Sequence, residues 1–75
     1  MANTTFSGPV ISNNGFTSTG IAFASLPAAS DNTGRIIFCP NALKASQTAG
    51  NGTGNLVFSD GSNWIRVDTG ANAGV

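Results

Sequence analysis

Few side chains in this sequence could carry out catalysis. It contains no His and no Glu, and its only acidic residues are Asp31, Asp60 and Asp68. A nucleophile activated by a histidine base, as in Ser-His-Asp and Cys-His enzymes, is therefore impossible within one chain. A pair of aspartates could in principle act as acid and base, but Asp31 and Asp60 fall in predicted turns, where Asp commonly bonds backbone groups. We predict that the protein is not an enzyme and uses no cofactor.

Binding motifs are equally sparse. The glycine-rich segment 50–54 lacks the Lys and the spacing of a phosphate-binding loop, so it predicts a turn or a flexible connection. Residues 60–63 offer several oxygen atoms, but not the spaced carboxylates and closing Glu of a calcium-binding hand. The single Cys39 and the lack of His argue against a structural metal site. We predict that Cys39 is a small buried hydrophobic residue and that no metal is bound.

The element around which the chain is organised is a predicted hairpin over residues 55–70. Two short apolar runs flank Asp60-Gly61, a strong hairpin signal. The turn could span these two residues alone or the four residues 60–63. In either register one face carries alternate apolar side chains, which we predict to form the core together with Ile37: Leu56, Phe58, Ile65 and Val67. The other face is expected to be mixed, with Val57, Ser59, Trp64, Arg66 and Asp68.

Trp64 has three possible roles on that mixed face. It could pack on the core, anchor a contact between subunits, because Trp is enriched at interfaces, or stack on a sugar. Because of the second possibility, we include Trp64 among the predicted interface residues.

The rest of the chain predicts short elements. Residues 21–26 alternate as in a strand closed by Pro27, and residues 35–39 form an uninterrupted apolar run typical of a strand covered on both faces. Residues 41–47 are the single helix candidate. We expect an all-β fold: a small antiparallel β-domain over residues 21–70 with a C-terminal hairpin, an extended N-terminal arm over 1–20, at most one short helix, and a flexible tail over 71–75.

The arm carries four hydrophobic residues among closely spaced turn signals. These residues cannot build a core by themselves, and we predict that the arm crosses a surface, which they contact: Phe6, Val10, Ile11 and Phe16. A loose terminus is the alternative interpretation.

Composition favours a chain that works inside an assembly. A chain of 75 residues buries only about 60% of its unfolded surface, and it usually needs a disulfide, a metal or a partner subunit for stability. One cysteine excludes an intrachain disulfide, which leaves association. Charged residues make up only 8% of the chain and the net charge is zero, so we expect no nucleic-acid partner. The sequence contains no apolar stretch long enough for a membrane span and no signal-peptide pattern. The single cysteine agrees with synthesis in a reducing cytoplasm, which we expect.

Two segments carry a resemblance to a known class of proteins. One is in the arm and reads Phe6-Ser-Gly-Pro-Val10, followed by Asn14-Gly15-Phe16. The other is the hairpin, which reads Leu56-Val-Phe-Ser-Asp-Gly-Ser-Asn-Trp-Ile-Arg-Val67. The chain resembles small virion structural proteins of tailed bacteriophages, especially those of marine bacteria, and the hairpin looks like the G-x-L-V-x-S-D-G-x-x-W pattern of head and tail appendage proteins. The likeness covers about a third of the chain, and residues 21–54 have no counterpart in it.

The resemblance implies a capsid decoration (cement) protein, a homo-oligomer and expected trimer, that binds the major capsid protein on the outer surface of the virion head. The alternatives are a short tail, collar or fibre component and, from a different class, a carbohydrate-binding module that presents Trp64.

Overall fold

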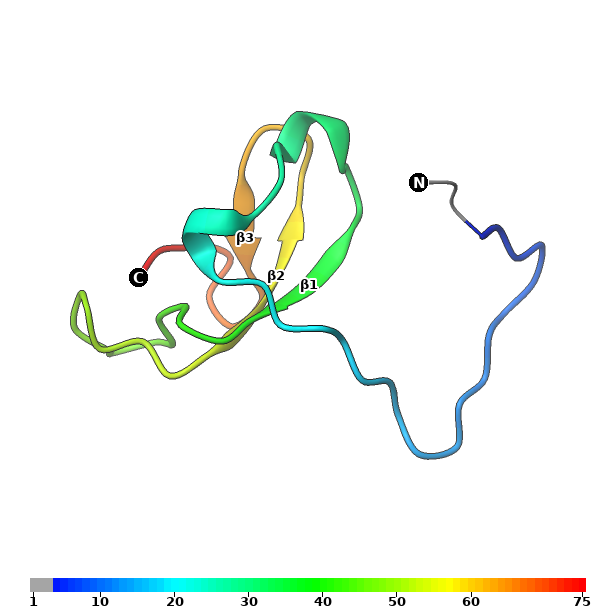
Figure 1. The fold of residues 1–75 in the computed structure, drawn as a ribbon, viewed down its shortest axis with the longest axis horizontal. Coiled ribbons are helices and arrows are strands. Elements are labelled where there is room, and N and C mark those ends of the chain that lie inside the picture. The colour runs from blue at the N-terminus through cyan, green and yellow to red at the C-terminus, as the bar shows by residue number, and fades with distance from the viewer. Residues whose placement is uncertain (1–3) are drawn as a thin grey trace.

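The fold is a small three-stranded antiparallel sheet preceded by a long extended arm (Figure 1). The computed structural model describes residues 4–75. Strands β1 (Ile36–Cys39), β2 (Asn55–Ser59) and β3 (Trp64–Arg66) lie side by side in that order. Two single turns of 3-10 helix, η1 (Phe23–Ser25) and η2 (Ala29–Asp31), precede them, and the described residues contain no α-helix. The prediction of a small all-β domain with a C-terminal hairpin is confirmed.

Strands β2 and β3 form the hairpin through the longer of the two possible loops, residues 60–63, and Phe58 pairs with Ile65. The Asp60 carboxylate closes this loop by accepting hydrogen bonds from the backbone N–H groups of Asn63 and Ser62, at 2.8 and 2.9 Å. These bonds stabilise the charged carboxylate and hold the pKa of Asp60 below its ordinary value. A side chain that bonds its own turn is the usual role of Asp here.

The buried face of the hairpin is opposite to the one predicted. Val57 and Ser59, from the face expected to be mixed, are 0% and 1% exposed. Leu56 and Val67, predicted as core, are 45% and 52% exposed, and Phe58 is only half-buried. The prediction that this face forms the core of the single chain is therefore wrong, although one of its members is buried: Ile65.

The core lies where Val57 meets strand β1. Ile37, predicted as core, is buried beside Val57, and Cys39 is fully buried as expected. Burial raises the pKa of the Cys39 thiol, because an apolar environment disfavours the thiolate. The segment between residues 21 and 31 covers this side of the sheet. Side chains packed on the core are Ile21, Phe23, Leu26, Trp64 and Ala73.

Strand β1 is covered on one face, not on both. Its side chains alternate between buried and exposed along the strand. Ile36 and Phe38 are 65% and 37% exposed, so the prediction of a doubly covered strand is wrong for the single chain. The strand ends at Cys39, before Pro40, as predicted.

Residues 21–26 do not form the predicted strand. The backbone N–H of Ile21 donates to the carbonyl of Phe38 at the outer edge of β1, at 3.0 Å. The chain then leaves that edge and turns through η1, where the N–H of Phe23 donates to the side-chain oxygen of Asn41 at 3.0 Å. The alternation of side chains in this segment was therefore insufficient to predict a strand. A strand would have to pair with the edge of β1 along its length, and only Ile21 bonds that edge.

Residues 41–47 do not form the predicted helix either. The N–H of Leu43 donates to the carbonyl of Gly74 at 2.9 Å, and the N–H of Ala45 donates to the carboxylate of Asp68 at 2.7 Å. A helix over 41–47 would need the N–H of Ala45 for the carbonyl of Asn41, four residues earlier, whereas the N–H of Leu43 would have no partner within its first turn. Bonds to distant partners satisfy both N–H groups here, so a segment too short to sustain a helix by itself adopts turns.

The C-terminal residues, for which the sequence carried no structural signal, lie along β3. The N–H of Arg66 donates to the carbonyl of Ala71, and the N–H of Ala73 donates to the carbonyl of Trp64, at 2.9 and 2.8 Å. An isolated bridge also pairs Ile65 with Asn72. The outer edge of β3 is therefore satisfied within the chain.

Candidate functional site

The arm presents its hydrophobic side chains to solvent. Every residue from 4 to 20 is exposed, including the four predicted contact residues: Phe6, Val10, Ile11 and Phe16. The arm joins the sheet at the edge of β1, where the Ser18 hydroxyl accepts a hydrogen bond from the N–H of Phe38 at 3.4 Å. Farther out, the Ser12 hydroxyl donates to the carbonyl of Gly15 at 2.6 Å and forms a turn. Figure 1 shows the arm running away from the sheet and bending back at a distance from it.

The second apolar surface is the uncovered face of the sheet, here called the apolar sheet face. It consists of side chains from β1, from β2 and from the residue after β3: Ile36, Phe38, Leu56, Phe58 and Val67. The β3 residue on this face, Ile65, is buried. The register pairs Ile36 with Phe58 and Phe38 with Leu56, so these side chains are direct cross-strand neighbours. None of them is charged, and all are exposed to water in the single chain except Phe58, which is half-buried.

The structure therefore separates the predicted site residues into two groups. The four arm residues lie together on an exposed segment, whereas Trp64 lies on the opposite, buried side of the sheet. The sequence analysis missed Ile36 and Phe38 as surface residues, although the uninterrupted apolar run of β1 indicated that both faces of this strand need a cover.

Trp64 packs against the core. It is half-buried, and its indole N–H donates to the carbonyl of Pro27 at 2.8 Å. One side of the ring reaches a shallow hollow of about 320 Å³, which Ser62, Asn63 and Asn72 also line. The packing on the core and the hydrogen bond to Pro27 hold the ring against the domain, which agrees with the core-packing role of Trp64.

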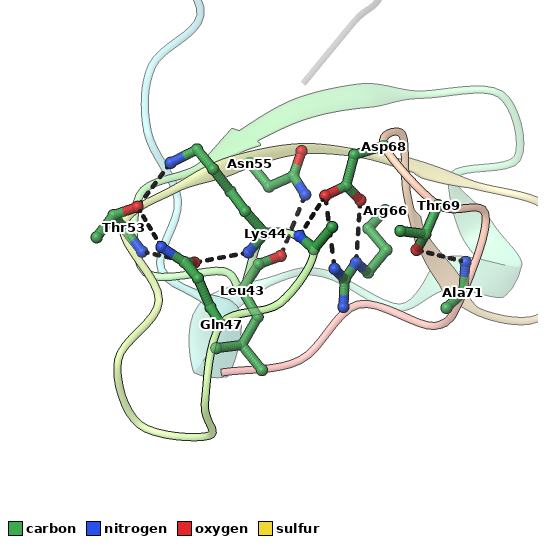
Figure 2. A network of polar contacts seen from close by, with 10 residues as sticks. Leu43, Lys44, Gln47, Thr53, Asn55, Arg66, Asp68, Thr69 and Ala71 are labelled. Carbon is green, nitrogen blue, oxygen red and sulfur yellow. Dashed lines mark hydrogen bonds and ion pairs between the residues drawn. The ribbon is translucent and has the colours of Figure 1, made fainter.

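A group of interacting polar side chains joins the loop after β1 to the hairpin (Figure 2). Thr53 Oγ1 accepts hydrogen bonds from Lys44 Nζ at 2.6 Å and from Gln47 Nε2 at 2.8 Å. Gln47 Oε1 in turn accepts from the backbone N–H of Lys44 at 2.7 Å. Asn55, at the start of β2, donates to the carbonyl of Leu43 at 3.1 Å. These bonds hold the irregular loop in place.

Asp68 is the acidic member of this network. Its carboxylate forms an ion pair with Arg66 at 3.0 Å and accepts the N–H of Ala45 at 2.7 Å. The hydrogen bond from Arg66, reinforced by that from Ala45, holds the pKa of Asp68 far below its ordinary value. Such a carboxylate is a poor proton acceptor at neutral pH, and the network positions a loop rather than a reacting group.

Within residues 4–75, no group of three or more His, Cys, Asp or Glu side chains could hold a metal ion. Over the same residues, no helix is long and apolar enough to cross a membrane. A hollow of about 790 Å³ lies between Thr4–Phe6 of the arm and residues 31–35, and it is open to solvent. The features that remain unsatisfied in the single chain are thus the two apolar surfaces.

Comparison of the chain with models of protein families, with curated proteins and with solved structures gives no match.

Proposed function

We propose that the protein is a structural component of a tailed-bacteriophage virion, specifically a decoration protein that binds the outer surface of the head and bridges capsid subunits. The observation that carries this proposal is the amount of apolar surface that the single chain exposes. More large hydrophobic side chains lie on the arm and the apolar sheet face than in the core. Monomeric proteins rarely expose contiguous apolar patches of this kind, and such patches mark sites of protein contact.

The chemistry of these surfaces supports contact with protein chains. Residues 1–20 contain no charged residue, and neither does the apolar sheet face. Both would gain little from nucleic acid or another highly charged partner, and both gain from apolar burial. A structural subunit that stays permanently in an assembly meets this requirement, and the likeness of the hairpin to phage appendage proteins gives the assembly its proposed identity.

The test is the abundance of the protein in purified phage particles, measured by quantitative mass spectrometry against the major capsid protein. We expect a ratio set by repeated positions of the head lattice, and labelled antibody on the head surface in electron micrographs. A few copies per particle with label at the tail or at one vertex would instead identify an appendage component. Absence from purified particles would refute a virion role altogether.

A further inference from the structure

We infer that the apolar sheet face is the docking site for the N-terminal arm of a second copy of this chain. The inference rests on the proposed function and deepens it, because it assigns the two surfaces described above to contacts between neighbouring copies of the chain in the assembly. Each chain carries one apolar arm and one apolar face, so an exchange of arms covers both surfaces in every copy and closes with symmetry.

The area available matches a stable contact. A fully exposed large apolar residue offers on the order of 150–200 Å². Weighted by exposed fractions between 51% and 85%, the four arm residues offer roughly 500 Å². The apolar sheet face offers roughly 350 Å² by the same reasoning. Each chain that gives one arm and receives another buries about 850 Å², close to the ~800 Å² per partner of a standard interface.

Direct packing of two sheet faces against each other is less favourable. It would bury only about 700 Å² in total, below the ~1,200 Å² at the lower end of stable interfaces. It would also leave the four apolar side chains of each arm in water. Arm exchange covers both surfaces with one contact.

The path of the arm also argues against closure onto the face of its own chain. Residues 18–21 are held at the outer edge of β1 by the hydrogen bonds of Ser18 and Ile21 to the backbone of Phe38. Beyond them, the arm runs away from the sheet and bends back, and Thr4–Phe6 line a hollow with residues 31–35, none of which belongs to the apolar sheet face (Figure 1). Residues 4–17 can span up to about 45 Å when extended, which far exceeds the ~15 Å across three strands of another copy.

Disulfide trapping on the full-length chain distinguishes the possible occupants. One variant carries Ser7→Cys, next to Phe6 on the arm, and another carries Leu56→Cys at the centre of the face. The native Cys39 can stay, because it is fully buried, and the wild-type chain controls for its reactivity. Ser30→Cys, an exposed position outside both surfaces, measures the background of random collisions.

We expect the mixture of the two variants to form a disulfide between different chains well above the Ser30→Cys background. A double variant that instead gives an internally cross-linked monomer would show that the arm covers its own chain and would overturn the inference. Efficient cross-linking of Leu56→Cys to itself would show face-to-face packing, with the same consequence. No cross-linking above background would also refute it.

Sedimentation equilibrium provides a second measurement. Phe16→Ser should weaken self-association by about ten- to a hundredfold, as expected for the loss of one buried aromatic side chain. Val75→Ser removes an exposed hydrophobic residue outside the defined surfaces and should leave association unchanged. A wild-type chain that stays monomeric at all concentrations, or an unchanged Phe16→Ser, contradicts the inference. Both experiments use purified protein alone, so they test the exchange of arms independently of whether the protein occurs in virions.

Discussion

Replacing Val57 with Ala removes two methyl groups from the fully buried face of the sheet. Transfer of these groups contributes about 0.8 kcal/mol each, and the cavity left among Ile37, Cys39 and Trp64 adds a comparable amount. We expect the free energy of unfolding to fall by about 2–3 kcal/mol. Leu56→Ala, on the neighbouring residue, is the matched control. Because Leu56 is nearly half exposed, its truncation should cost only about 1–1.5 kcal/mol in the monomer.

The assay is urea unfolding followed by Trp64 fluorescence, at protein concentrations low enough to keep the chain monomeric. The cost of Val57→Ala should not depend on concentration. The cost of Leu56→Ala should rise as the chain associates, because the apolar sheet face is then covered. If Leu56→Ala is the more damaging change in the monomer, the assignment of the buried face is wrong.

Three further predictions concern the contacts within the domain. Ser59→Ala should lower the free energy of unfolding by about 1–3 kcal/mol in the same assay, because the buried hydroxyl donates to the carbonyl of Ala29 at 2.6 Å. Ser59→Thr, which keeps the hydroxyl group, is the comparison. An unchanged unfolding midpoint for Ser59→Ala would refute the role of this bond. Gly52→Ala should lower the thermal midpoint by more than 5 °C, a loss of about 1–2 kcal/mol for a domain of this size, since a Cβ there would lie 2.7 Å from the backbone carbonyl of Ala42. Because the folded chain lowers the pKa of Asp68, its carboxylate stabilises the fold fully above pH 3.8, and this contribution declines as the pH falls below that value. Thermal midpoints measured from pH 6 to pH 2.5 should therefore fall less steeply for Asp68→Asn than for the wild-type chain, and parallel curves would contradict this account.

Local signals were sufficient for the elements that depend on neighbouring residues alone. The hairpin formed as predicted, because the Asp60 carboxylate bonds the backbone of its own loop and needs no distant partner. Strand β1 ended before Pro40 because proline cannot continue a strand ladder. These features follow from backbone chemistry within a few residues, which any fold containing this stretch would share.

Elements that depend on a distant partner were not predictable in the same way. Residues 21–26 alternate like a strand, but only Ile21 bonds the edge of β1. Residues 41–47 have a helical composition, but Ala45 bonds the carboxylate of Asp68 across the fold. A strand edge to pair with, or a hydrogen-bond acceptor from a distant part of the sequence, comes close only when the chain has folded. A local sequence pattern therefore does not predict it.

The sequence alone determined that the chain is all-β, that its hairpin turns within residues 60–63, and which side chains share each face. The tertiary structure decided which of the two faces is buried. Alternation could not decide this, because Val57 on one face and Leu56 on the other are both apolar. The segment that covers the Val57 face decided it, since its backbone carbonyls accept the hydroxyl of Ser59 and the indole N–H of Trp64. Ser59 and Trp64 are thus two of the residues that made this face look mixed in the sequence, and only the folded chain provides partners for their polar groups.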